Sequence, residues 1–261
     1  MKRICGLTEA PAGLARFHAD PTTVKTWNEF GTFEDGIARR ELTDALRDGQ
    51  HGLCAYCEIR LDPNDKRVEH FVPQGDSAQG AALACDHRNL MAVCKGGSDA
   101  IFGPNSLTPD PSRFLPPVRK NISCDAAKGD RSATEFLDPR QIPAAPSLVQ
   151  VNSGGRIESE PSACAGHAVS KADVDAHIVA LRLNVERLRI QREAVWDELT
   201  KFYINLAQQS EETKHDLVFA LAERRLLPRP DGSLAAFFST TRSFFGPVAE
   251  TILTQSPQRW I

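Results

Sequence analysis

The segment GLCAYCE at residues 52–58 contains two cysteines, Cys54 and Cys57, that are separated by two residues. This spacing lets one tight turn direct both sulfur atoms toward a single tetrahedral metal ion. Cys94 and Cys124 follow in a stretch that is interrupted by many glycine, proline, aspartate and asparagine residues. Because such a stretch is poor in core residues, four thiolates around a zinc ion would stabilise it. The sequence therefore predicts a structural zinc site formed by these four cysteines.

Other residues could supply ligands to the same ion. Cys85 lies between the two cysteine pairs, and Cys164 and His167 have the C-x-x-H spacing of half a zinc site. The spacing alone leaves these alternatives open. A redox role for Cys54 and Cys57 would need a strand-to-helix context like that of thioredoxin, which the flanking residues do not suggest.

The composition is that of an ordinary folded protein. Of the 261 residues, 41% are hydrophobic and 25% are charged, and the net charge is -3. Basic and acidic residues are nearly balanced along the chain, which excludes a strongly basic nucleic-acid arm. The first residues lack the apolar run of a secretory signal, and no stretch approaches the roughly 20 apolar residues of a membrane span. We therefore expect a cytoplasmic protein without a membrane partner.

The placement of glycine and proline residues between apolar stretches predicts four regions. Residues 1–50 predict a helical segment of two or three short helices, and residues 51–140 form the cysteine-containing module. Residues 141–169 predict a linker or small hairpin around a Gly-Gly pair, and residues 170–261 predict a helical end. Within that end, apolar residues recur every three or four positions from Val174 to Leu206, which predicts one long amphipathic helix.

Acidic, imidazole and amide side chains lie between and beside the cysteines. Glu69 and His70 are adjacent within VEHFVP at residues 68–73, an apolar and β-branched stretch typical of a strand. Asn89 follows in DHRNL at residues 86–90, and Asp125 directly follows the last of the four cysteines in CDAAKGD at residues 124–130.

This order of motifs resembles the HNH nucleases. The resemblance implies an α+β fold: a ββα-metal HNH core stapled by a four-cysteine zinc site, here flanked by N-terminal helices and a C-terminal helical region. QHGLCAYCE at residues 50–58 and LRLNVERL at residues 181–188 are similar to the HNH subunit of Septu-type antiphage systems, including those attached to retrons. The function implied is hydrolysis of nucleic-acid phosphodiester bonds, with DNA as the expected substrate, in a defence complex with an ATPase subunit of the ABC or SMC type.

The resemblance also implies roles for individual residues. His70 would be the general base that activates the attacking water, a role suited to a group with an ordinary pKa near 6.5. Glu69 and Asp125 would hold one catalytic divalent ion, and two carboxylates favour magnesium or manganese. Asn89 would brace the loop that carries His70, and Lys128 would contact a flanking phosphate.

Two departures from the HNH pattern are visible. Asp125 stands where the family usually has histidine or asparagine, and 29 residues separate Cys94 from Cys124 where the common motif has two. The inserted loop carries three cations that could contact nucleic acid: Arg113, Arg119 and Lys120. Two alternatives remain beside a DNA nuclease, namely an RNA-directed nuclease and a catalytically inactive, zinc-stapled adaptor that docks a partner.

Overall fold

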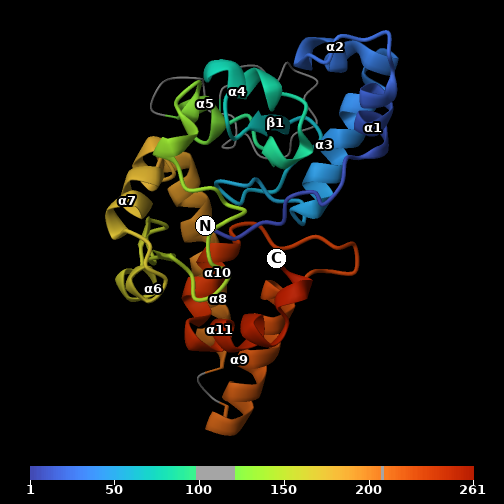
Figure 1. Cartoon of the computed structure of the whole chain (residues 1–261). Coiled ribbons are helices and arrows are strands. Elements are labelled where there is room, and N and C mark those ends of the chain that lie inside the picture. Colours follow the sequence, from blue (N-terminus) through green and yellow to red (C-terminus); the bar gives the residue numbers. More distant parts are fainter. Residues whose placement is uncertain (98–120, 207–208) are drawn as a thin grey trace, which may run out of the picture.

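The computed structural model describes residues 1–97, 121–206 and 209–261 of the chain (Figure 1). The described part combines many helices with two antiparallel hairpins of two strands each. Arg113, Arg119 and Lys120, which were expected to contact nucleic acid, lie outside the described residues. No helix in these three ranges is long and apolar enough to span a membrane.

The N-terminal region forms the short helices α1 (Ala12–Ala19), α2 (Trp27–Thr32) and α3 (Ile37–Gly49). Helix α2 begins at Thr26, whose side chain accepts a hydrogen bond from the Glu29 N–H at 3.3 Å. Helix α1 packs closely on α3, because a Cβ atom at Gly13 would lie only 2.6 Å from the Ala38 Cα. These helices therefore form one unit beside the central hairpin.

The central hairpin consists of β1 (Arg67–His70) and β2 (Leu90–Val93), which pair antiparallel with Glu69 opposite Met91 and His70 opposite Leu90. Helix α4 (Ser77–Ala82) and a short 3-10 turn lie between the two strands in sequence. All four residues of β2 are buried. The short helix α5 (Asp125–Lys128) packs against β1, since its last residue reaches Glu69.

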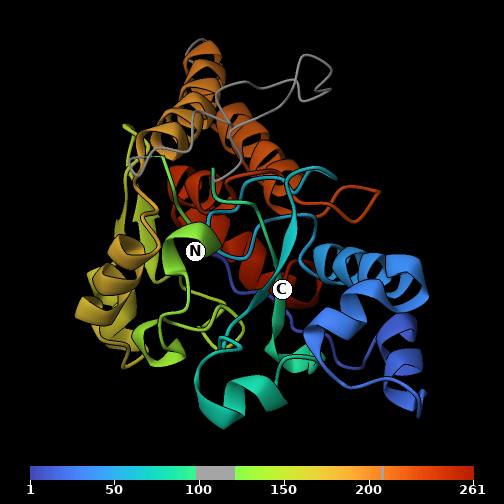
Figure 2. The same cartoon turned by 90° about the horizontal axis from the view of Figure 1, so that it is seen from above.

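A second hairpin, β3 (Val149–Val151) and β4 (Ile157–Ser159), turns at Gly154 and Gly155. It is followed by α6 (Pro161–Gly166), α7 (Lys171–Ala180) and α8 (Glu186–Asn205). Figure 2 shows α6 and α7 on the opposite side of the central hairpin from the N-terminal helices.

The expected single helix from residue 170 to 206 is wrong, because the chain breaks between α7 and α8. Arg182 adopts a positive φ of 52°. Asn184 turns its amide to the second hairpin, where Oδ1 accepts from the Ile157 N–H at 2.9 Å and Nδ2 donates to the Ile157 carbonyl at 2.8 Å. Leu181 and Leu183 are both buried at this break. Tertiary hydrogen bonds have therefore replaced helical ones in the five residues between α7 and α8.

The C-terminal region contains α9 (Glu211–Leu226), α10 (Phe238–Phe245) and α11 (Pro247–Gln255). Helices α8 and α9 run side by side away from the central hairpin (Figure 1). A separate hydrophobic cluster holds this region together and includes Leu53 from the cysteine-containing module. Glu58 joins the two parts, because its buried carboxylate accepts hydrogen bonds from the Ser239 N–H at 2.7 Å and the Lys2 N–H at 2.7 Å.

Candidate active site and metal centre

Four buried cysteines gather at the base of the central hairpin. Cys54 and Cys57 come from the turn before β1, Cys94 directly follows β2, and Cys124 directly precedes α5. Their sulfur atoms all lie within 4.8 Å of one another, and those of Cys57 and Cys94 are 3.7 Å apart. Tetrahedral zinc with Zn–S bonds of about 2.3 Å separates its sulfur ligands by about 3.8 Å. The four cysteines therefore fit a metal ion such as zinc.

A close backbone contact brings the late cysteine to the early ones. The Ser123 N–H donates to the Gly96 carbonyl at 2.9 Å. Gly96 has a φ of 65°, and a Cβ atom there would lie 2.1 Å from the Ser123 carbonyl oxygen. Only glycine fits this approach, so the two cysteine-bearing segments meet despite the long insertion.

Helix α8 carries two buried arginines, of which Arg187 supports the segment before Cys124 and Arg192 bonds to the break between α7 and α8. Arg187 donates from Nε to the Asn121 carbonyl at 2.9 Å and also contacts the Ser123 hydroxyl. Arg192 donates to the Leu183 carbonyl at 2.7 Å. A tetrathiolate around a divalent ion carries net negative charge, and buried cations nearby offset part of it.

The alternative zinc ligands lie in other places. Cys164 is buried on α6 with its sulfur 3.7 Å from the Leu148 carbonyl, and the His167 ring contacts the Ala145 carbonyl at 3.1 Å. Cys85 is also buried, but among the described residues only the four cysteines at the base of the hairpin form a cluster that could hold a metal. The structure thus brings together the ligand set expected first.

The second feature is a carboxyl pair beside β1. The Glu69 and Asp125 carboxyl groups lie beside each other, and both are largely buried, although the two residues are distant in sequence. Lys128 Nζ lies 2.8 Å from Glu69 Oε1, and the Tyr56 hydroxyl donates to the same oxygen at 3.1 Å. Arg67 Nη1 lies 3.1 Å from Asp125 Oδ2. Two cations and two acids thus share one small, largely buried site.

Burial raises the pKa of Glu69 to about 8, and both the hydrogen bond and the negative charge of Asp125 act in the same direction. Lys128 opposes this shift but does not outweigh it. Burial also raises the pKa of Tyr56, which therefore remains a hydrogen-bond donor near neutral pH. A divalent ion would favour the ionised form of both carboxylates, so this pair fits a hard cation such as magnesium or manganese.

His70 is adjacent to the carboxyl pair in sequence and is 8% exposed. Its Nε2 lies 2.9 Å from the Ala84 carbonyl oxygen. Because a carbonyl oxygen only accepts, Nε2 carries the proton and Nδ1 keeps its lone pair. Burial lowers the pKa of His70, which keeps the ring neutral at pH 7. The Trp27 ring packs against it in an edge-to-face arrangement, with 4.5 Å between the ring centroids.

Asn89 fixes the chain immediately after His70. Its Oδ1 accepts from the Val72 N–H at 2.8 Å, and its Nδ2 donates to the Val72 carbonyl at 3.0 Å and the Leu83 carbonyl at 3.3 Å. The two bonds to Val72 join the two ends of the connection between β1 and β2, and the bond to Leu83 fixes its later part. This arrangement holds the loop in one conformation and with it the orientation of the imidazole.

Lys128, expected to contact a flanking phosphate, instead lies buried at 1% exposure. Besides Glu69, its amine donates to the His70 carbonyl at 3.2 Å. Its spacing from Asp125 on one short helix, three residues, places both side chains toward β1.

Two neighbours of the site, Tyr56 and Trp27, were not among the residues predicted from sequence. Tyr56 lies between the two cysteines of the first pair, so its place beside the metal centre was visible in the motif. Trp27 lies 43 positions before His70 in the N-terminal helical segment, and no local pattern connects them.

Part of the chain is similar to a known protein. No known family model matches the chain. Over 107 residues the chain is 36% identical to the "Retron Ec83 putative HNH endonuclease" of Escherichia coli, a match that covers 40% of this chain and 37% of that protein. The chain thus spans little more than a third of the length of this relative. The match supports the HNH endonuclease family that the motifs indicate.

Proposed function

We propose that this protein is a metal-dependent HNH endonuclease that hydrolyses phosphodiester bonds of DNA. The observation that carries the proposal is the Glu69–Asp125 carboxyl pair, held next to His70 by a hairpin and a short helix that the four-cysteine cluster joins. This arrangement agrees with a ββα-metal core. The partial similarity to a retron HNH endonuclease supports the same conclusion.

Glu69 and Asp125 would hold the divalent ion. When bound, the ion would polarise the scissile phosphate and stabilise negative charge on the leaving oxygen. Glu69 must lose its proton before it can bind the ion, because burial and Asp125 favour its protonated form. Lys128 and Arg67 provide positive charge to the pair from two different elements.

His70 would take a proton from the attacking water at Nδ1. The Ala84 carbonyl fixes the Nε2–H tautomer, and burial lowers the pKa so that the base is unprotonated at neutral pH. Asn89 keeps the loop in place through its three bonds to Val72 and Leu83.

The test is nicking of supercoiled plasmid DNA by wild type and His70→Ala in magnesium, in manganese and without either ion. We expect nicking that requires the ion and a loss of about 100-fold or more in His70→Ala, the usual contribution of a general base. His215→Ala is the matched control, because His215 is exposed on α9 away from the site. Equal nicking by wild type and His70→Ala would refute the assigned role.

The wider biological role is part of the same proposal. We expect the chain to be the nuclease of an antiphage defence complex, with an ATPase of the ABC or SMC type as its partner. The support is the retron relative and the balanced charge, since a nuclease with a net charge of -3 gains little from nonspecific attraction to DNA. Plasmid nicking with and without the ATPase tests this dependence, and full activity of the isolated chain would count against it.

One observation favours the alternative of a catalytically inactive adaptor. Lys128 Nζ contacts the same Glu69 oxygen that a metal ion would use. An adaptor would assemble with its partner and protect cells equally well with His70→Ala, whereas a nuclease would assemble but lose protection.

Nicking of RNA but not DNA in parallel reactions would assign the substrate to RNA.

A further inference from the structure

A hollow of about 860 Å³ opens on the side of the site that faces the N-terminal helices. It is formed by α2, the first half of α3 and the chain entering β1. The residues of interest here are those that carry positive charge into it: Arg39, Arg40, Lys66 and Arg67. They come from chain segments whose charge is balanced in the sequence, so folding concentrates the cations.

The four cations differ in whether they form ion pairs with carboxylates. Two carboxylates also line the hollow, Asp35 and Asp44, and Asp44 pairs with Lys66. Arg39 and Arg40 are exposed on α3, and neither forms an ion pair with a carboxylate among the described residues. An exposed guanidinium without a carboxylate partner is available for a phosphate group.

Two series of side-chain contacts connect this hollow to the site. Arg67 lines the hollow and also contacts Asp125 at 3.1 Å. The Arg39 guanidinium lies 5.0 Å from the centre of the Trp27 ring, and the same ring packs edge-on against His70. A strand lying in the hollow would therefore be one side chain, Arg67, away from the carboxyl pair, and it would be separated from the imidazole by Arg39 and Trp27.

The site itself requires such a neighbour. The carboxyl pair offers no positive charge of its own to the phosphates that flank the scissile group, and Lys128 is buried, with its amine on Glu69. Positive charge for the flanking phosphates must then come from the rim. Arg39 and Arg40 are placed at that rim and leave the site free for the scissile group.

We propose that this hollow seats the phosphate backbone of the DNA strand next to the scissile phosphate, with Arg39 and Arg40 as its principal contacts. The inference rests on the proposed nuclease function and specifies where that enzyme would hold its substrate. Recognition through phosphate alone would be independent of sequence.

The test measures binding of a short fluorescent DNA duplex by anisotropy, in a His70→Ala background so that the duplex stays intact, over a series of salt concentrations. Arg39→Ala/Arg40→Ala should weaken binding about tenfold or more at low salt. It should also reduce the slope of log affinity against log salt by about 2, because each phosphate contact contributes about 0.9. Arg39→Lys/Arg40→Lys should bind close to the parent protein, since it keeps both charges.

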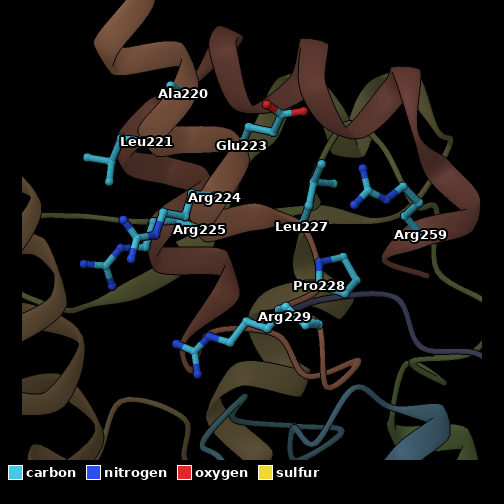
Figure 3. Close-up of a pocket in the computed structure, with 10 residues that line it drawn as sticks. Ala220, Leu221, Glu223, Arg224, Arg225, Leu227, Pro228, Arg229 and Arg259 are labelled. Carbon is cyan, nitrogen blue, oxygen red and sulfur yellow. The ribbon is translucent and has the colours of Figure 1, made fainter.

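The matched control removes two arginines from another hollow. Arg224, Arg225, Arg229 and Arg259 line a pocket at the end of α9 that shares no lining residue with the first. In Figure 3 the side chains of Arg224, Arg225 and Arg229 extend toward the same side of this pocket. Arg224→Ala/Arg229→Ala changes the net charge by the same amount and should leave affinity within about twofold. Equal weakening by the two double variants would overturn the proposal, because total charge alone would then explain binding.

The outcomes separate this inference from the nuclease proposal. Normal binding by Arg39→Ala/Arg40→Ala overturns the inference, even if the wild type nicks plasmid in a His70-dependent manner. Absence of DNA binding by the parent protein at low salt overturns it as well. Loss of binding in this variant, together with a wild type that nicks neither DNA nor RNA even with the ATPase present, supports the binding surface and refutes the enzyme.

Discussion

The carboxyl pair predicts an unusual dependence of stability on pH. The pKa of Glu69 is raised from 4.5 to about 8, mainly by burial and then by Asp125. When the pKa of an acid is higher in the folded state than in the unfolded state, the protonated acid stabilises the folded protein. This contribution is fully present below the unfolded-state pKa and is lost as pH rises toward the folded-state pKa. Wild type without the catalytic ion should therefore lose stability between pH 4.5 and 8.

The magnitude follows from the two pKa values. Each pH unit between them is worth about 1.4 kcal/mol, so the full loss is about 5 kcal/mol, of which about 3 kcal/mol falls between pH 6 and 8.5. Glu69→Gln keeps the shape of the protonated acid but cannot ionise, so its stability should not show this decline. His70 and His177 titrate in both proteins, and comparison of the two cancels their contribution.

Urea unfolding at pH 6, 7 and 8.5 measures this difference, in buffer that contains no magnesium or manganese and no chelator, so that the cysteine cluster keeps its metal. We expect the wild-type free energy of unfolding to fall relative to that of Glu69→Gln as pH rises. Magnesium added at pH 8.5 should restore wild type and not the variant, because an ion that binds the ionised pair stabilises the folded state. Parallel curves over this range would show that Lys128 outweighs burial and would refute the reasoning.

Two further predictions concern the framework of the fold. Cys57→Ser should release the metal of the four-cysteine cluster and destabilise the protein, while Cys164→Ser should retain it, as metal analysis of the purified proteins would show; the reverse result would disprove the ligand set. Glu58→Ala should lower the free energy of unfolding by about 3 to 5 kcal/mol, because it leaves buried donors of Lys2 and Ser239 without an acceptor. Glu198→Ala, which breaks only an exposed pair, should cost under about 1 kcal/mol in the same urea titration, and equal losses would contradict the role of Glu58.

The cysteine cluster was predictable because ligand spacing is a local property. Cys54 and Cys57 share one turn, and Cys94 and Cys124 follow in the same stretch poor in core residues, so a shared ion could be expected despite the long insertion. The break between α7 and α8 was not predictable from periodicity, since the apolar spacing continues through it. The decisive interaction is between Asn184 and the Ile157 backbone, which are distant in sequence.

The charges of the site were also only partly predictable, because they depend on contacts between residues distant in sequence. The motif identifies the acids, Glu69 and Asp125, because they lie beside residues with recognisable spacing. Their counter-charges are Lys128, from the same short helix as Asp125, and Arg67, from the start of β1, and spacing alone did not assign either cation to these acids. Sums of charge along the chain are nearly zero and hide this arrangement.

Cations that contact the carboxylates and cations at the exposed rim have different effects on the site. A cation that touches a carboxylate in a buried site stabilises the folded protein, but it also competes with a divalent ion for that carboxylate. Lys128 is in this position, with its amine on Glu69. A cation at the exposed rim does not compete, because it can attract the phosphates of a substrate while the carboxylates remain available. Arg39 and Arg40 are in that second position. A site that must bind both a metal and a polyanion therefore gains from keeping these two kinds of positive charge on separate elements.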